Sequence, residues 1–349
     1  TGAGGSIGSE LCRQIIKQKP QKLLLVEISE YALYSIHNKL EDFKNIDTEI
    51  IPLIGSVQDS QRMESILSIF KPATIYHAAA YKHVPIVEEN LIEGLKNNLL
   101  GTYDLAKLAI KNNVLNFVFI STDKAVRPTN IMGATKRMAE LSLQAFHQKN
   151  ITLSERENKT KFSIVRFGNV LDSSGSVIPK FRDQIKNGGP ITLTHIDITR
   201  YFMTITEAAQ LVIQAGAMGQ GGDVFVLDMG NPIKIYDLAL KMIELSGLSL
   251  KSPTNTKGDI EIKITGLRPG EKLYEELLLS NSPSETKHPK IFRSNEPSIL
   301  HSELEKEINL LKKLIERNNI EEILNKLKNI VIDYSPSSEI VDHTFKQIS

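Results

Sequence analysis

The chain has 349 residues, of which 41% are hydrophobic and 24% are charged, and its 42 basic and 41 acidic residues leave a formal net charge of +1. This composition is typical of a globular protein with a sizeable core. The balanced charge excludes a global attraction to nucleic acid or to a membrane surface. The single cysteine, Cys12, excludes an internal disulfide and a cysteine-rich metal site, and no apolar run reaches the roughly 18 to 20 residues of a membrane-spanning helix.

The chain opens with eight residues that are rich in glycine. They read Thr1-Gly2-Ala3-Gly4-Gly5-Ser6-Ile7-Gly8 and lead into a segment of helical period at 10–19. Such glycines permit a tight turn and a close approach of backbone amides to a pyrophosphate, whose charge a helix N-terminus stabilises. The strand-like run 23–26 then ends in Glu27, near the ~20-residue offset of an acid that binds ribose hydroxyls. Because a carboxylate there repels a 2′-phosphate, we expect NAD rather than NADP.

Strand-like runs alternate with segments of helical period through the first half of the chain. We expect strands at 23–26, 74–77, 117–120 and 162–165, and helices at 10–19, 60–70, 94–112 and 135–149. Alternation of this kind predicts an α/β fold of the Rossmann type, with a doubly wound parallel sheet. Right-handed crossovers bring the carboxyl ends of the strands to one edge, where ligands bind.

The amino-acid composition changes after Arg166, where glycine, proline and threonine become frequent. We expect an NAD-binding Rossmann domain at 1–167, to which 205–245 returns, and a smaller, discontinuous substrate-binding domain at 168–204 and 246–295. Residues 296–349 are expected to form a helical C-terminal tail, because apolar residues recur at helical spacing from 302 to 331. A surface-packed helical pair is the preferred interpretation of this tail.

Two short motifs follow the predicted strand at 117–120. The first, Ser121-Thr122-Asp123-Lys124, places a hydroxyl, a carboxylate and an amine side by side, which is enough acid and base for proton transfer. The second places Met132 four residues before Lys136, one helical turn away and on the same face. A thioether cannot carry a proton, so we expect the acid and base of the first motif to perform the chemistry. A solvated turn is the alternative reading of Asp123 and Lys124.

Together these stretches resemble the extended short-chain dehydrogenase/reductase superfamily, in which Tyr normally precedes the lysine by four positions. The motifs 121–125 and 130–136 are similar to those of nucleotide-sugar 4,6-dehydratases of bacterial polysaccharide and glycoprotein pathways, and so are 82–85, 166–171, 175–179, 199–203 and 268–272. Met132 in place of Tyr is typical of the large, membrane-anchored UDP-N-acetylglucosamine 4,6-dehydratases of the PglF type, which are CapD-like. The resemblance implies an N-terminal membrane region before Thr1 and a location at the cytoplasmic face of the inner membrane.

The resemblance also implies a reaction. The sugar C4 is oxidised by hydride transfer to tightly bound NAD, water is eliminated across C5 and C6, and the hydride returns to C6. The family assignment makes Asp123 the acid towards C6 and Lys124 the base towards C5, and burial of both would favour the neutral forms that these roles need. An ion pair between them would oppose those forms. Thr122 is expected to bond the sugar hydroxyl, with a cap as its alternative role.

The residues expected around the ligands follow from the same reasoning. The cofactor contacts are Gly2, Gly5, Ser6, Ile7, Gly8, Glu27, Ser56, Ala78, Ala79, Ala80, Lys82, Asn98, Ser121 and Lys136. The substrate contacts are Lys82, His83, Thr122, Asn169, Ser176, Val177, Ile178, Thr192, Thr194, Arg200, Arg268 and Glu271. Arg200 and Arg268 are expected to bind the diphosphate, because a guanidinium matches phosphate oxygens. His83 and His195 have no ligand partner at metal spacing, so no metal is expected.

Two other functions compete with dehydration. A nucleotide-sugar 4-epimerase or simple dehydrogenase of the same fold would be expected to keep the Tyr, and a non-catalytic NAD-binding scaffold would have no need of Asp123, Lys124 and Lys136. We expect UDP-N-acetylglucosamine as the substrate, no nucleic-acid partner, no membrane contact by this segment itself, and a homo-oligomer.

Overall fold

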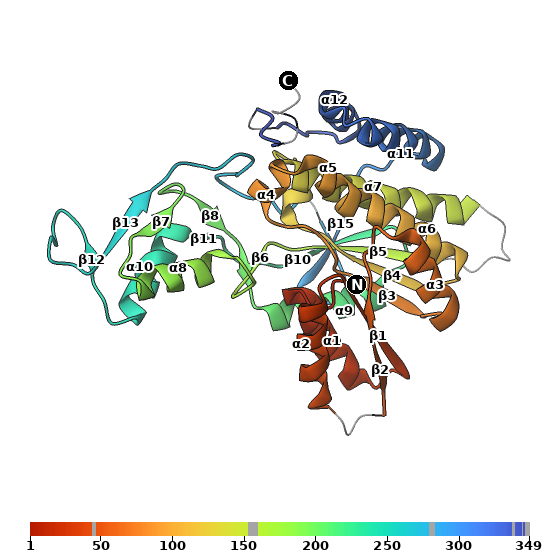
Figure 1. Ribbon diagram of the computed structural model, residues 1–349, viewed down its shortest axis with the longest axis horizontal. Coiled ribbons are helices and arrows are strands. Elements are labelled where there is room, and N and C mark those ends of the chain that lie inside the picture. Colours follow the sequence, from red (N-terminus) through yellow and green to blue (C-terminus); the bar gives the residue numbers. More distant parts are fainter. Residues whose placement is uncertain (44–46, 153–159, 279–282, 337–338, 344, 346–349) are drawn as a thin grey trace.

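Six strands form one large sheet in the computed structural model, which describes residues 1–43, 47–152, 160–278, 283–336, 339–343 and 345 (Figure 1). The strand order is β14-β15-β10-β5-β4-β3. Its parallel members are β3 (Thr74–His77), β4 (Asn116–Ile120), β5 (Lys161–Arg166) and β10 (Asp223–Leu227). Two antiparallel strands, β15 (Ile291–Ser294) and β14 (Ser284–Glu285), extend the edge beyond β10. The predicted α/β fold with a parallel sheet is confirmed.

Helices cover both faces of this sheet. Because alternate residues of a strand point to opposite sides, each strand contributes side chains to the core on both faces. Phe117 and Phe119 of β4 pack in the core beneath α3 (Ser60–Phe70), α6 (Gly101–Lys111) and α7 (Ile131–Thr152), whereas Val118 and Ile120 pack in the core beneath α1 (Ser6–Ile15) and α9 (Ile205–Met218). A strand buried on both faces consists of apolar residues throughout, as β4 does. The remaining segments on the α6–α7 side are α4 (Val84–Glu88), α5 (Leu91–Gly94) and the π-helical turn η2 (Leu95–Leu100).

A second parallel pair, β1 (Lys22–Glu27) and β2 (Glu49–Ile54), lies beside β3 and carries α2 (Glu30–Glu41). Residues 1–3 run between β1 and β3 and bond to both. The Thr1 ammonium donates to Tyr76 O at 2.9 Å, Ala78 N donates to Thr1 O at 3.1 Å, and Ala3 N donates to Val26 O at 3.3 Å. A cavity of about 560 Å³ continues from Thr1 between the two strands.

A smaller unit projects from the large sheet on the left of Figure 1. It contains the sheet β12-β13-β7 (Leu250–Lys251, Ile260–Ile264, Ile191–Leu193), the pairs β11-β8 (Ile233–Lys234, Thr199–Arg200) and β6-β9 (Asn169–Val170, Phe202–Met203), and the helices α8 (Val177–Lys186) and α10 (Ile235–Leu245). The range 205–245 therefore returns to the large sheet through α9 and β10, but α10 packs its apolar face on α8 and β13. Residues 284–294, expected in the smaller unit, instead form β14 and β15 of the large sheet.

The helical period at 302–331 corresponds to α11 (His301–Glu316) and α12 (Ile320–Ile330). Their buried leucines and isoleucines join the core on the α7 side of the large sheet, and Figure 1 shows both helices above α7. Within the described ranges, no helix combines the length and the apolar character needed to cross a membrane.

Candidate active site

The glycine loop packs so closely that Gly2 and Gly8 have no space for a side chain. Gly2 has a φ of +65°, and a Cβ there would lie 2.6 Å from Ala79 N. A Cβ on Gly8 would lie 1.9 Å from Gly2 O. Helix α1 begins at Ser6 directly after the loop, with Gly5 rather than a capping side chain at its N-cap. The loop can therefore present backbone amides and a helix N-terminus to an anion.

Glu27 is buried at the end of β1 and holds the loop in place. Its Oε2 accepts from Gly4 N at 2.9 Å, and its Oε1 accepts from the amides of Ile28 and Ser29 at 3.0 and 3.1 Å. The same side chain lines a cavity of about 320 Å³, here called the strand-end cavity. Predicted cofactor contacts in its wall are Gly2, Gly5, Glu27, Ser56, Ala78, Ala79 and Ala80.

Two neighbouring amides in the π-helical turn η2 have different roles, although Asn97 Nδ2 donates to Asn98 Oδ1 at 3.1 Å. Asn98 is fully buried, accepts from Tyr81 N at 2.8 Å and donates to Tyr81 O at 2.9 Å. Asn97, which the sequence analysis did not select, lines the strand-end cavity. Asn98 therefore fixes the loop after β3, and Asn97 is the amide that reaches the cavity. A π turn shifts the helical register by one residue, and such turns are frequent at functional sites.

A larger cavity of about 630 Å³, the central cleft, lies at the carboxyl ends of β3, β4 and β5 and shares part of its wall with the strand-end cavity. Predicted site residues in its wall are Gly2, Gly5, Ser6, Ile7, Gly8, Ala78, Ala80, Lys82, His83, Ser121, Thr122, Lys124, Met132, Lys136, Asn169 and Ser176. The fold thus gathers residues from 2 to 176 around one space, at the sheet edge where the sequence predicts ligands.

Helix α7 carries Met132 and Lys136 to the wall of the central cleft. Lys136 Nζ donates to Ile120 O at 2.9 Å and lies 4.3 Å from the centre of the Phe119 ring. Burial lowers the pKa of Lys136 to about 7, although the Glu140 carboxylate opposes this shift. The amine can therefore exchange its proton near neutral pH. Glu140 accepts in turn from Ser121 Oγ at 2.6 Å and pairs with the buried Arg166.

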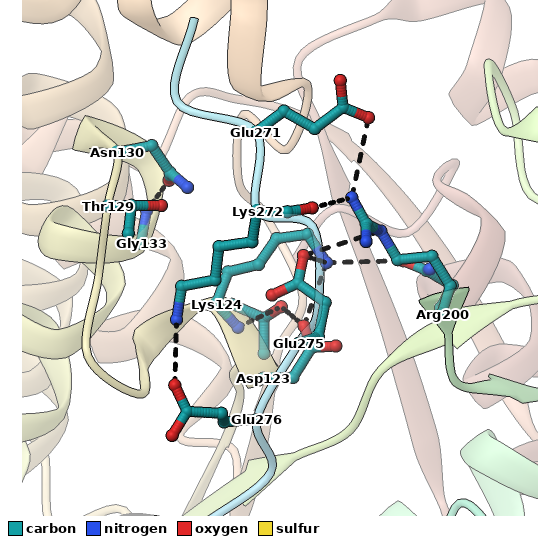
Figure 2. A network of polar contacts seen from close by, with 12 residues as sticks. Asp123, Lys124, Thr129, Asn130, Gly133, Arg200, Glu271, Lys272, Glu275 and Glu276 are labelled. Carbon is teal, nitrogen blue, oxygen red and sulfur yellow. Dashed lines mark hydrogen bonds and ion pairs between the residues drawn. The ribbon is translucent and has the colours of Figure 1, made fainter. Parts of the chain in front are cut away.

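Asp123 and Lys124 form an ion pair, with Lys124 Nζ 3.0 Å from Asp123 Oδ1 (Figure 2). A second carboxylate oxygen, Glu275 Oε1, lies 3.4 Å from Lys124 Nζ. Lys124 Nζ also donates a hydrogen bond of 3.4 Å to the amide oxygen Oδ1 of Asn169. Burial alone would lower the pKa of Lys124, but Asp123 and Glu275 outweigh it and raise that pKa above its ordinary value. The ion pair considered in the sequence analysis is the observed arrangement.

Asp123 lies behind the wall of the central cleft rather than in it. Its side chain is 0% exposed, and its Oδ2 has no hydrogen-bond partner among the described residues. Thr122 connects it to the cleft: Thr122 Oγ1 donates to Asp123 Oδ1 at 2.9 Å and accepts from Lys124 N at 3.3 Å. Thr122 is therefore a cap, as the alternative reading had it, and also a hydroxyl that lines the cleft.

A further cavity of about 200 Å³, the lateral cavity, lies between α8 and β7 and shares part of its wall with the central cleft. Predicted substrate contacts in its wall are Asn169, Ser176, Val177, Thr192, Thr194, Arg200, Arg268 and Glu271. Asn169 and Ser176 line both spaces. Ile178 and His195 do not belong to the wall of any of these three cavities.

The charges of the lateral cavity are distributed differently from the prediction. Arg200 donates to the carbonyls of Thr199, Lys272 and Leu273 at 2.7, 2.7 and 3.2 Å, so most of its hydrogen-bonding capacity is used within the protein. Arg268 is exposed. Lys180 also lines the cavity, and its pKa is lowered by burial and by the positive charge of Arg268. Two cations that repel each other form a site that an anion would stabilise.

Sequence reasoning missed Asn97, Lys180 and Glu275. Lys180 could have been found from α8, whose apolar residues recur at helical spacing after the Ser176 N-cap. No sequence pattern indicates that Glu275 belongs to the site, because its position depends on a tertiary contact between residues near 275 and the loop after β4.

Comparison with known proteins identifies the family. The family model described as "Polysaccharide biosynthesis protein" matches residues 1–296. The chain belongs to this family. Over 307 residues it is 50% identical to the capsular polysaccharide biosynthesis protein CapD of Staphylococcus aureus, which covers 87% of this chain and 49% of that protein. The chain therefore spans about half the length of this relative.

More distant sequence relatives and solved structures are also similar to this chain. A UDP-glucose 4-epimerase of Rickettsia bellii is 32% identical over 80% of this chain and 76% of its own. Among solved structures, Pen from Bacillus thuringiensis is 34% identical with a TM-score of 0.73, covering 86% of this chain and 89% of that one. The dTDP-glucose 4,6-dehydratase DesIV of Streptomyces venezuelae, solved with NAD and TYD bound, shares the fold at 19% identity and a TM-score of 0.65, covering 79% and 86%.

Proposed function

We propose that this polysaccharide biosynthesis family member is an NAD-dependent UDP-N-acetylglucosamine 4,6-dehydratase. The observation that carries the proposal is the Asp123–Lys124 pair at a cleft where Met132 offers no hydroxyl. An acid and a base side by side suit elimination of water, whereas a 4-epimerase needs neither of them for its hydride transfers. The UDP-N-acetylglucosamine assignment rests on the resemblance of the Met132 motif to the large dehydratases.

The residues of the strand-end cavity and the central cleft fit NAD. The tightly packed glycine loop lines the strand-end cavity with Gly2, Gly4 and Gly5, where its backbone amides could bind a diphosphate, and the anchored Glu27 carboxylate suits ribose hydroxyls. Lys136, at the inner end of the cleft, would hold the nicotinamide ribose. NAD bound here would supply the acceptor and the donor of the hydride.

The Asp123–Lys124 pair can supply both forms that elimination needs through one internal proton transfer. Moving a proton from the Lys124 ammonium to Asp123 gives a neutral amine and a carboxylic acid. The amine then takes the C5 proton, and the acid gives its proton to the C6 hydroxyl, which leaves as water. The pair ends as the ion pair that the structure shows. Thr122, hydrogen-bonded to Asp123 and lining the cleft, would pass the proton between the buried acid and the sugar.

The lateral cavity would hold the nucleotide diphosphate. Lys180 and Arg268 provide positive charge there, and α8 begins at its wall with Val177. Asn169 and Ser176, shared with the central cleft, would lie where the diphosphate meets the sugar. In this arrangement the hexose would lie beside Lys124.

Product mass after incubation with NAD and UDP-N-acetylglucosamine tests the proposal. We expect a product lighter than the substrate by one water. Lys124→Met and Asp123→Asn should each reduce turnover by roughly 100-fold or more, since a positioned acid or base contributes about 10² to 10⁴. Lys241→Met, on the exposed side of α10, is the matched control and should retain activity. A product of unchanged mass would instead support a 4-epimerase, the activity named for the Rickettsia relative.

A further inference from the structure

Residues 268–276, here called the strap, cross from the smaller unit over the loop that follows β4. Hydrogen bonds hold the strap in place on both sides. Asn130 Nδ2 donates to Gly270 O at 3.0 Å and Lys272 Nζ donates to Val126 O at 2.9 Å, while Arg200 donates to the carbonyls of Lys272 and Leu273. Figure 2 shows the strap passing between Arg200 and the Asn130 region. The position of its side chains is therefore fixed relative to Lys124.

Glu275 is the strap residue that points at the Asp123–Lys124 pair. Its side chain is 2% exposed, and its Oε1 lies 3.4 Å from Lys124 Nζ and 3.7 Å from Arg200 Nε. Its Oε2 is buried and has no hydrogen-bond partner among the described residues. A buried carboxylate that is only half satisfied is costly to the fold, so its presence beside Lys124 calls for a functional explanation.

The charges around Lys124 show what Glu275 contributes. Asp123 and Glu275 face the ammonium as anions, and Arg200 and Lys82 act on it as cations. With Glu275, two negative charges face three positive ones, counting Lys124 itself. Without Glu275, Asp123 would be the one carboxylate that raises the Lys124 pKa, because Glu271 lies 3.5 Å from Arg200 and faces the arginine instead. An opposite charge within about 4–6 Å shifts a pKa by about 1–3 units, so Glu275 has a strong effect on the proton of Lys124.

We propose that Glu275 is a positioning residue for Lys124, which it holds beside Asp123 and keeps protonated until the substrate is bound. The inference rests on the proposed function, in which the pair must carry one proton. The same strap bears Arg268 and Glu271 of the lateral cavity. A nucleotide bound there would therefore contact the segment that sets the charge of Lys124.

The reactivity of Lys124 measures this effect without any turnover. Trace acetylation with acetic anhydride at pH 8, followed by peptide mass spectrometry, reports the fraction of each lysine that is neutral. Glu275→Gln should make Lys124 about 10-fold more reactive, because a fall of one pKa unit is a tenfold change in the neutral fraction. The matched control is Glu276→Gln: this neighbour is 43% exposed and pairs with Arg127 and Lys272 rather than Lys124. Equal Lys124 reactivity in the two variants would overturn the proposal.

Glu275→Asp is the second variant, because it keeps the charge and also serves if the glutamine protein does not fold. It should leave Lys124 reactivity within about threefold of the parent. A tenfold rise in Glu275→Asp as well would refute a role for the charge and assign the effect to lost packing.

Turnover provides an independent readout that a purely structural role would not change. The pair loses its proton as pH rises, so Glu275→Gln should move the alkaline limb of the kcat profile about one unit lower, with KM for UDP-N-acetylglucosamine unchanged. An unmoved limb contradicts the proposal. If Lys124 reactivity changes as expected but no UDP-sugar loses water, the proposed function fails and the role of Glu275 stands.

Discussion

Replacing Lys136 with methionine should remove a pH-dependent contribution to stability. Methionine has a similar length and no charge, so the packing beside Phe119 is kept while the titrating amine is lost. In the unfolded chain the lysine is protonated up to its ordinary pKa of 10.5, whereas in the folded protein burial lowers the pKa to about 7. Between these values the unfolded state binds more protons, so stability rises with pH.

The size of this effect follows from the shift. Each pKa unit corresponds to about 1.4 kcal/mol, so the full window is worth about 5 kcal/mol. The free energy of unfolding of the parent minus that of Lys136→Met should therefore be flat below pH 7. It should rise by about 3 kcal/mol from pH 7 to pH 9. Loss of the hydrogen bond to Ile120 O adds an offset of about 1 kcal/mol that does not vary with pH.

Urea unfolding followed by circular dichroism at pH 6, 7, 8 and 9, without added cofactor, measures both curves. Titrating groups that do not interact with Lys136 cancel in the difference. Two groups do interact with it, but neither changes charge in this pH range: burial holds the pKa of His77 well below 6.5, and Arg166 lowers the pKa of Glu140 to about 2 against the effect of burial. Lys241→Met, an exposed lysine, is the control and should give a difference that does not change with pH. A flat difference for Lys136→Met as well would show that the amine stays protonated in the folded protein, and would refute the argument from burial.

Three further outcomes can be measured. Gly8→Ala places a Cβ 1.9 Å from Gly2 O and should abolish NAD binding in isothermal titration calorimetry; retained affinity would show that the loop can shift. Arg166→Met removes one of the two cations that pair with the buried Glu140 and Glu296 and leaves Arg137 to face both; it should cost about 3–5 kcal/mol in urea unfolding, against less than about 1 kcal/mol for the exposed Arg182→Met. Thr122→Val removes the hydroxyl between Asp123 and the cleft and should lower kcat about 10-fold or more at unchanged KM; activity equal to the parent's would exclude it from the mechanism.

The sequence predicts the large sheet well because burial on both faces leaves a direct signal. Residues 117–120 are apolar without interruption, and the strand they predict is β4 of the structure. The glycine loop and Glu27 are predictable for a similar reason, since their spacing reflects a local turn between consecutive elements. Helices α2, α8 and α10 were not identified, although the apolar residues of α8 recur at helical spacing.

The parts of the site that depend on tertiary contacts escape this reasoning. The sequence predicts Asn98 as a cofactor contact, whereas Asn97 lines the strand-end cavity. A π turn changes which side chain of a helix faces the cavity, and the amino-acid composition does not indicate such a turn. Arg200 was expected to face phosphate, yet it donates to the carbonyl of Thr199 and to two carbonyls of the strap. Glu275 reaches Lys124 across 151 positions of the chain only because the strap crosses the β4 loop.

The attachment of β1 and β2 to the rest of the protein has a consequence for dynamics. In the described part of the chain these two strands meet the large sheet through bonds made by Thr1 and Ala3, not through a strand ladder. Amide hydrogens of β1 and β2 should exchange with deuterium faster than those of β4 and β5, which are paired on both sides. The strand-end cavity is walled by Glu27 from one part and by Ala78, Ala79 and Ala80 from the other. A dinucleotide bound there would contact both parts and slow the hydrogen exchange of the backbone amides in each of them.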